Sequence, residues 1–353
     1  MRLSDAARQA WPPFVLVTGL LLVGLAAHTD HLFERIGGSL ERLPGGSTVL
    51  FVVSALVVAV VTAVLNLDTA VVFLTPVVVL AARRRGVCEQ PFLYAAVFMA
   101  NASSLYLPGS NLTNLLVLSR DPVSGGTFAA RLLAPALAAT IVTAVGLWLL
   151  SRSQLRHGNP TATAPGPPPP REWTGLIATT AAAALTVGLP QPALPVLGVG
   201  LIAVGTAVMR GRLELRAVAR AVGPGVLLSL FVASVLLGVL ARTWNGPAQL
   251  IAGADRWETA TIGALAAVVV NNLPATVLLS AHTLPHPRAL LVGLNLGPNL
   301  AVTGSLSAYL WIRAARQVGA SPSIRAFSRR GIILAPAAIL AALTAAAVVS
   351  SPS

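Results

Sequence analysis

The sequence contains no lysine, only one cysteine and few charged residues, so that all 24 basic side chains are arginine. Charged residues make up 10% of the 353 positions, and hydrophobic residues make up 55%. Soluble domains carry about a quarter charged residues, so this composition excludes an ordinary soluble fold. The single thiol, Cys88, excludes a disulfide within the chain and a metal site made of several thiolates.

In place of charge, the chain has a series of long apolar segments. A helix of about 20 residues crosses the hydrocarbon core of a bilayer, whereas a membrane β-barrel is built from alternating strands of about ten residues. Solid apolar blocks therefore predict an all-α polytopic membrane protein, a multi-pass protein of the plasma membrane (the inner membrane in bacteria) in contact with lipid. The expected full spans are residues 11–28, 128–150, 173–189, 193–209, 222–241 and 331–349.

Arginine is concentrated at the ends of the apolar segments. Fifteen of the 24 arginines lie in residues 83–85, 151–172, 210–220 and 313–330. This is the pattern of cytoplasmic loops, and it argues against a nucleic-acid partner despite the net charge of +13. The N-terminus is then expected outside the cell. Between the first two apolar segments, residues 30–43 have apolar positions at helical spacing, which indicates either a short interfacial helix or a solvated loop.

Four short polar, asparagine-rich patches interrupt the apolar segments, and they form two matching pairs. A broken backbone survives at membrane depth only where it lines a cavity or is buried in protein. Breaks at corresponding places in two halves of a chain indicate the binding site of a transporter. The first pair is 66–69 and 101–104 (which runs on to 108–111), and the second is 271–274 and 295–299 (which runs on to 303–305).

The same order of elements is expected in each half: a re-entrant hairpin, a discontinuous transmembrane helix and a full span. Arginine counting places the two hairpins on opposite sides of the membrane, so we predict two inverted-topology repeats. The proline-rich segment between them is typical of a semi-rigid linker, and its arginines predict that it lies in the cytoplasm. The predicted division is a first membrane repeat over residues 1–150, the linker over 151–172 and a second membrane repeat over 173–353.

Asp68 is the one carboxylate that lies deep in an apolar segment. An ionisable group at that depth marks a functional site, and burial favours the neutral form of a carboxyl group. Asp68 is therefore the candidate for the coupling proton. The structural alternative, that it caps the helix starting at Thr69, stays open at this point. A membrane-embedded enzyme needs two convergent catalytic groups, so no enzymatic activity is expected, and a purely structural protein would not need paired breaks.

Amides, hydroxyls and freed backbone groups at the breaks supply both donors and acceptors for a solute. Helix N-termini there suit anions or polar oxygens, and carbonyls at a break suit Na⁺. The alternative is that these groups only satisfy backbone and cap helices. No zinc-ligand spacing or phosphate loop is present, so neither metal nor cofactor is expected. The candidate substrate-binding residues are Asn66, Asp68, Thr69, Asn101, Ser110, Asn111, Thr113, Asn271, Asn272, Asn295, Thr303, Gly304 and Ser305.

Four strings carry a resemblance to the arsenite permease (arsenical pump membrane protein) family, within the ion transporter superfamily that includes dicarboxylate/sodium symporters. They are LNLDTAVVFLTPVVV (65–79), ANASSLYLPGSNLTNLL (100–116), NNLPATVLLSA (271–281) and LNLGPNLAVTGSLSAYLW (294–311). The resemblance implies inverted repeats meeting at the midplane, and a scaffold that often forms a homodimer. It also implies efflux of As(OH)₃ or Sb(OH)₃ driven by protons or by a partner ATPase.

The chain departs from that family pattern in two ways. One span precedes the first hairpin where the family usually has more, and Asn101 and Asn295 stand where some members carry Asp, which leaves Asp68 as the titrating group. We predict a secondary active transporter that exports arsenite, antimonite or a similar small inorganic solute by proton antiport. The alternative is a sodium-coupled anion (dicarboxylate-type) symporter or a Na⁺/H⁺ antiporter. The absence of arginine from the four breaks argues against a di- or tricarboxylate substrate.

Overall fold

The computed structural model describes residues 3–119, 123–156, 170, 172–244 and 246–350. Within these ranges the chain is helical and contains no strand. Five of the described segments are long and apolar enough to cross a membrane. The predicted all-α polytopic fold is therefore confirmed. These segments are Ala10–Thr29, Ser47–Val64, Gly125–Arg156, Leu215–Ala241 and Ile324–Val348.

The first half of the chain runs through a long helix, a hairpin of helices, a broken helix and a second long helix. Its elements are α1 (Leu3–Thr29), α2 (Leu32–Glu41), α3 (Ser47–Val64), α4 (Leu67–Arg84), α5 (Gln90–Ser103), the 3-10 turn η1 (Pro108–Ser110), α6 (Leu112–Leu118) and α7 (Gly125–Arg156).

The second half repeats this order after two additional apolar helices and a short helix that contains none of the buried residues. Its elements are α8 (Thr174–Gly188), α9 (Ala193–Met209), α10 (Leu215–Val222), α11 (Pro224–Thr243), α12 (Gly246–Ala252), α13 (Arg256–Val270), α14 (Asn272–Leu279), α15 (Pro287–Leu296), the 3-10 turns η2 (Gly297–Asn299) and η3 (Val302–Gly304), α16 (Leu306–Gln317) and α17 (Ile324–Ser350).

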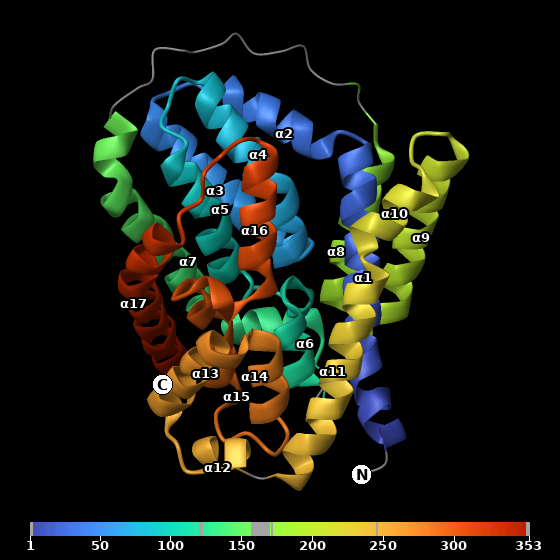
Figure 1. Cartoon of the computed structure of the whole chain (residues 1–353), viewed down its shortest axis with the longest axis vertical. Helices are drawn as coiled ribbons and strands as arrows, with labels where there is room; N and C mark the ends of the chain where they lie inside the picture. The colour runs from blue at the N-terminus through green and yellow to red at the C-terminus, as the bar shows by residue number, and fades with distance from the viewer. Residues whose placement is uncertain (1–2, 120–122, 157–169, 171, 245, 351–353) are drawn as a thin grey trace.

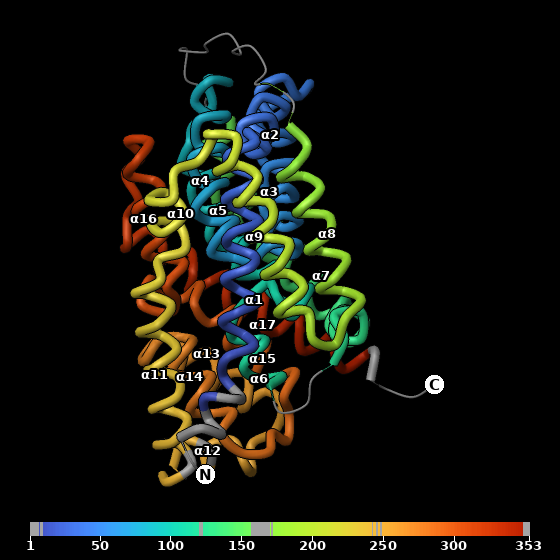
Figure 2. The backbone as a smooth tube through the Cα atoms, turned by 90° about the vertical axis from the view of Figure 1, so that its right-hand side faces the viewer, coloured from blue at the N-terminus to red at the C-terminus, as the bar shows by residue number. Residues whose placement is uncertain are grey.

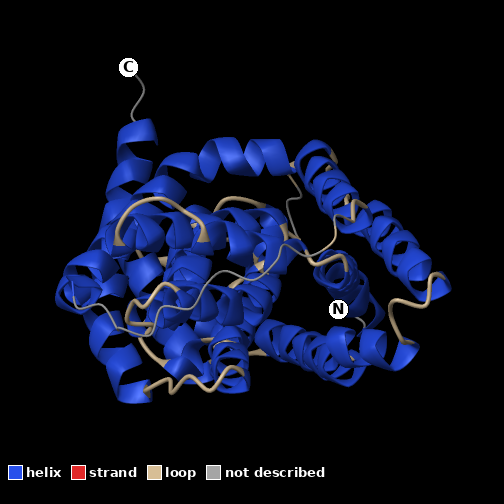
Figure 3. Ribbon diagram, turned by 90° about the horizontal axis from the view of Figure 1, so that it is seen from above, coloured by secondary structure: helices blue, strands red, loops and turns tan. Residues whose placement is uncertain are grey.

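The helices form two groups. Helices α1, α8, α9, α10 and α11 lie together on one side of the molecule, and the hairpins and broken helices form the other (Figure 1). Seen from above, the helices around the N-terminus lie apart from a larger group (Figure 3). The α3–α4 and α13–α14 hairpins lie toward opposite ends of the second group (Figure 1). We call the first group the scaffold and the second the hairpin domain.

Close helix packing holds the scaffold together. Helix α1 packs along α9 and also contacts α8 and α11. A Cβ atom placed on Gly19 of α1 would lie 2.7 Å from the backbone nitrogen of Leu197 in α9, and one placed on Gly200 would lie 2.8 Å from the Gly19 carbonyl oxygen. Small residues that let helix backbones approach closely are the usual means of packing helices in lipid, where apolar burial supplies no driving force.

The arginine clusters counted in the sequence meet at one end of the molecule, which we call the arginine-rich end. Arg83 donates to the Val318 carbonyl oxygen, which joins the end of α4 to the end of α16. The Arg84 Nη1 atom lies 2.6 Å from the Oε1 atom of Glu41 in α2, which forms an ion pair between α4 and α2. Arginine-rich ends of membrane proteins face the cytoplasm, and α1 begins at the opposite end (Figure 2).

Several expected boundaries differ from the structure. The return arm of the first hairpin is longer than the expected 69–82, because α4 continues to Arg84. Helix α2 confirms that residues 30–43 contain a short helix, and its position at the membrane interface stays a prediction. Helix α7 includes the first six residues of the expected linker, and most of the remainder, residues 157–169 and 171, lies outside the described residues. The division into domains and the inverted relation of the repeats stay predictions.

Candidate functional site

The first hairpin turns at Asn66–Thr69, which we call the first tip. The Asn66 Oδ1 atom accepts a hydrogen bond of 2.7 Å from the Thr69 backbone N–H, so Asn66 is the N-cap of α4. Asp68 lies in the first helical turn, is partly buried, and has no hydrogen bond or ion pair with any described residue. The alternative in which Asp68 caps this helix is therefore wrong, because Asn66 fills that role.

The second hairpin turns at Asn271–Pro274, the second tip. Asn271 has a φ of 74° and a ψ of 150°, a backbone conformation that residues other than glycine rarely adopt. Its Oδ1 atom accepts from the Leu273 N–H at 3.4 Å, and its Nδ2 atom donates to the Thr303 carbonyl oxygen at 3.1 Å. Asn272 is the first residue of α14 and is buried. The second tip is thus tied to its own broken helix.

One hydrogen bond occurs in the same place in both halves. The Ser110 hydroxyl donates to the Ala63 carbonyl oxygen at 3.0 Å, and the Thr303 hydroxyl donates to the Val268 carbonyl oxygen at 2.9 Å. In each half the donor belongs to the 3-10 turn of the broken helix, and the acceptor lies three residues before the tip asparagine. Ser110 and Thr303 were both predicted as binding residues. In the structure, each hydroxyl joins the 3-10 turn of its broken helix to the hairpin arm that precedes the tip.

The side chain of Asn295 joins the broken helices of the two halves. Its Oδ1 atom accepts from Ser104 Oγ at 2.5 Å and from Asn111 Nδ2 at 2.7 Å. Its Nδ2 atom donates to Asn114 Oδ1 and to the Leu291 carbonyl oxygen, both at 2.8 Å. These four bonds use the full capacity of a side-chain amide. Asn295 therefore acts as a structural link, and a bound solute would have to displace one of its partners.

A second link lies beside the first. Asn101 Nδ2 donates to Asn299 Oδ1 at 2.8 Å, and Asn299 Nδ2 donates to the Phe98 carbonyl oxygen at 3.3 Å. Asn101 and Asn295 lie in the last turns of α5 and α15, not in the breaks where the sequence placed them. We call the six linking residues, Asn101, Ser104, Asn111, Asn114, Asn295 and Asn299, the asparagine cluster.

At the first tip and on the first broken helix, five buried polar atoms have no hydrogen-bond partner among the described residues, and other unpaired polar atoms of this half lie on α3 and α7. Buried polar groups are almost always paired, so the five atoms are available to a solute or ion bound at the tip and the break. They belong to the first tip and to the two arms of the first broken helix. Asn66, Thr69, Asn101 and Thr113 were predicted from the sequence, and Ser103 was not. The atoms are Asn66 Nδ2, Thr69 Oγ1, Asn101 Oδ1, Ser103 Oγ and Thr113 Oγ1.

The last two predicted residues, Gly304 and Ser305, shape the second break. A Cβ atom on Gly304 would lie 2.5 Å from the Pro298 Cα atom, so only glycine fits this close approach of two backbone segments. Ser305 is the N-cap residue of α16, and its hydroxyl lies 2.6 Å from that of Ser307. Neither residue offers a free, buried polar group, in contrast to the first tip.

Comparison with known proteins places this geometry in a family. The family model described as citrate transporter (CitMHS) matches residues 6–293. The chain belongs to this citrate transporter family. An arsenical pump membrane protein of Escherichia coli K12 is 25% identical over 375 residues, an alignment that covers 96% of this chain and 86% of the relative. The predicted resemblance is therefore confirmed.

Two further comparisons found similar proteins. An uncharacterized transporter of Mycobacterium tuberculosis is 27% identical over 150 residues, 42% of this chain and 35% of the relative, so the chain spans about a third of that relative. The crystal structure of the Alcanivorax borkumensis YdaH transporter superimposes with a TM-score of 0.64 at 17% identity, covering 98% of this chain and 87% of that one. This likeness shows a shared fold. The protein is a multi-pass membrane transporter of the plasma membrane.

Some site residues of this citrate transporter family member were missed by sequence reasoning. Ser103, Ser104, Asn114 and Asn299 were not among the predicted binding residues, although they lie inside the strings that carry the resemblance. A signal for two of them was present. Asn114 follows Asn111 at i+3, and Asn299 follows Asn295 at i+4, spacings that place side chains on one helix face.

Proposed function

We propose that this protein exports a small neutral inorganic solute, arsenite or antimonite as its trihydroxide, in exchange for protons. The observation that carries the proposal is the first tip, where the Asp68 carboxylate has no partner among the described residues and the nearby residues Asn66 and Thr69 have unpaired Nδ2 and Oγ1 atoms. A carboxyl group held by no other residue is free to gain and lose a proton.

The surrounding chemistry suits a neutral substrate. The unpaired atoms are amide and hydroxyl groups, which donate to and accept from the three hydroxyls of As(OH)₃. Arginine is absent from the four breaks, so these segments carry no guanidinium to neutralise citrate or another carboxylate. The name of the Escherichia coli relative, arsenical pump membrane protein, agrees with this substrate class.

The experiment uses an arsenite-sensitive host that lacks its own pump. Expression of the chain is expected to restore growth on arsenite, and everted vesicles are expected to take up arsenite when a proton gradient is imposed. Asp68→Asn should abolish proton-driven uptake at normal expression. If that variant keeps the pH dependence of the wild type, Asp68 does not carry the proton.

A second candidate function is coupling to sodium, either as an anion symporter or as a Na⁺/H⁺ antiporter. Three of the unpaired oxygens, Asn101 Oδ1, Thr69 Oγ1 and Ser103 Oγ, are neutral acceptors of the kind that coordinate Na⁺ at broken helices. Proteoliposomes with opposed Na⁺ and H⁺ gradients separate the two candidates. Transport that follows the Na⁺ gradient at constant pH supports the second.

The assembly and the energy source belong to the same proposal. The family resemblance implies a homodimer joined through the scaffold, and a partner ATPase as an alternative to direct proton coupling. Export in vesicles that hold a proton gradient and no ATP supports direct coupling. Export that appears only when an ATPase subunit and ATP are supplied supports the alternative. Cross-linking of single-cysteine scaffold variants in the membrane tests the dimer.

A further inference from the structure

A cavity of about 450 Å³ lies between the scaffold and the hairpin domain, next to the first break. It is lined by α1 and the α8–α9 turn on one side and by η1, α6 and the start of α7 on the other. Its size falls within the range of about 300–1,000 Å³ that is typical of ligand pockets. Pro108 of the first break forms part of its wall.

The lining of this cavity is neutral and largely apolar. It contains no acidic or basic residue, and its side-chain hydroxyls and amide come from Ser119, Thr186 and Gln191. The Thr186 hydroxyl already donates to the Ala182 carbonyl oxygen. An apolar cavity stays dry and binds apolar molecules, which excludes an ion or a sugar as its occupant.

The depth of the cavity follows from the lengths of α8 and α9. These helices have 15 and 17 residues, so at 1.5 Å per residue they are roughly 22 and 26 Å long. The hydrocarbon core is about 30 Å thick. At their far ends, Arg212 after α9 forms an ion pair with Asp30 after α1, and Asp30 also accepts from the Gly175 N–H of α8, so this end lies at the arginine-rich surface. The turn between them therefore ends several ångströms short of the opposite surface, among acyl chains.

The composition of the α8–α9 turn agrees with this depth. Pro190, Pro192 and Pro195 lie in or next to it, and proline has no backbone N–H that would need a partner in lipid. The N–H groups of Leu189 and Val196 are bonded to carbonyl oxygens within the chain. Trp11 lines the rim of the cavity and is 40% exposed.

We propose that this cavity binds one acyl chain of a membrane phospholipid. The acyl chain would lie between the scaffold and the first broken helix. The occupant is a lipid chain because the opening lies at acyl-chain depth and the lining has no charge for a soluble ligand. Gly109, next to Pro108, packs against Leu20 and Thr186 at its edge, so an acyl chain at this seam supports the contact between the two helix groups.

The first test measures lipid retained by the purified full-length protein, using native mass spectrometry with added phosphatidylethanolamine. The wild type is expected to retain one phospholipid. Leu118→Trp and, as a second filling variant, Leu115→Trp should lose it. Leu137→Trp, on an exposed position of α7 outside the cavity, is the matched control and should retain it. Equal retention in filled and control variants, or no retained lipid in the wild type, overturns the proposal.

A second measurement remains informative if the filling variants do not fold. The fluorescence of Trp11 is obtained as the difference between the wild type and Trp11→Phe in proteoliposomes. Phosphatidylcholine brominated along its acyl chains should quench this signal strongly, and aqueous acrylamide should not. Quenching by acrylamide alone would show a water-filled cavity and would also overturn the proposal. Neither measurement depends on the transported substrate.

Discussion

Asn111 Nδ2 donates a hydrogen bond of 2.7 Å to Asn295 Oδ1, although the two residues are 184 positions apart. The bond joins the N-cap of α6 in the first half to the last turn of α15 in the second. Both side chains are buried, so separating them would leave amide groups without partners. We therefore expect the two broken helices to stay joined when the transporter changes conformation.

Replacing Asn295 should destabilise the protein more than any other change in the asparagine cluster. Asn295→Ala removes four hydrogen bonds and leaves Asn111 Nδ2 and Asn114 Oδ1 buried and unpaired, whereas the Ser104 hydroxyl keeps the Asn101 carbonyl oxygen as a partner. Each such atom costs about 1–3 kcal/mol, so an apparent loss of roughly 3 kcal/mol or more is expected. Thermal unfolding followed by size-exclusion fluorescence measures it.

Asn101→Ala is the control for that change, because it removes one inter-half bond and its Oδ1 atom is already unpaired. A loss of about 1 kcal/mol is expected for this variant. Equal melting temperatures for the two variants would contradict the structural role assigned to Asn295.

Replacing Asp68 should separate transport from stability. Because its carboxylate has no described partner, Asp68→Asn should change the apparent stability by no more than about 0.5 kcal/mol. Proton-driven transport should nevertheless be lost, since an amide does not exchange a proton, whereas Asp68→Glu should retain part of it. The measurement pairs unfolding curves with vesicle uptake at several pH values. A destabilised Asp68→Asn protein would assign the residue to the fold.

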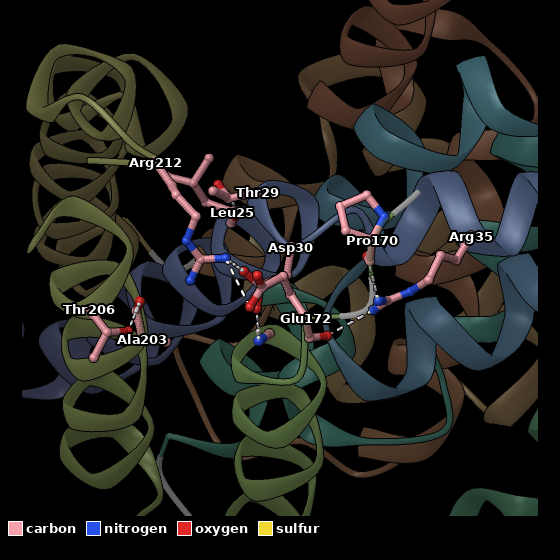
Figure 4. A network of polar contacts seen from close by, with 10 residues as sticks. Leu25, Thr29, Asp30, Arg35, Pro170, Glu172, Ala203, Thr206 and Arg212 are labelled. Carbon is pink, nitrogen blue, oxygen red and sulfur yellow. Dashed lines mark hydrogen bonds and ion pairs between the residues drawn. The ribbon is translucent and has the colours of Figure 1, made fainter. Parts of the chain in front are cut away.

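The ion pair between Asp30 and Arg212 should stabilise the arginine-rich end of the scaffold (Figure 4). Asp30 accepts from Arg212 at 2.8 Å and from the Gly175 backbone N–H at 2.5 Å, while Arg35 of α2 donates to the Pro170 and Glu172 carbonyl oxygens. Arg212→Ala leaves a buried carboxylate without its cation. Because Arg212 is partly exposed, the expected cost is about 2–3 kcal/mol, below the 3–5 kcal/mol of a fully buried pair.

A double-mutant cycle with Asp30→Asn tests this pair. The asparagine still accepts from the Gly175 N–H, so the double variant should be less destabilised than the sum of the two single changes. Additive losses would show that the two side chains do not interact in the membrane.

Glycine substitutions should locate the contact between α1 and α9. Gly19→Ala places a methyl group 2.7 Å from the Leu197 backbone nitrogen, so the helices must separate, at a cost of about 1–3 kcal/mol. Gly198→Ala, in α9 with open space around its Cβ position, should be neutral or stabilising by up to about 1 kcal/mol. Thermal unfolding of the two variants checks this, and a stable Gly19→Ala protein would contradict the packing.

Much of the fold could be predicted because the membrane restricts the options. Apolar length identified four of the five long spans among the described residues, whereas the expected spans 173–189 and 193–209 are the shorter helices α8 and α9. Arginine placement identified the shared end, and the tip residues Asn66 and Asn271 stand at the two hairpin turns. The roles within the site were harder to predict. Asn295 and Asn66 are the same residue type in similar strings, yet Asn295 is fully bonded and Asn66 has an unpaired donor.

Hydrophobicity and charge along the chain are local properties, and a bilayer converts them directly into spans, breaks and orientation. Those features therefore follow from the order of the amino acids. Which polar atoms remain free is a property of pairs of residues far apart in that order, as in the bond between Asn111 and Asn295. That distinction between a linking and a binding asparagine exists only once the two halves have packed, because packing alone determines which donors and acceptors meet.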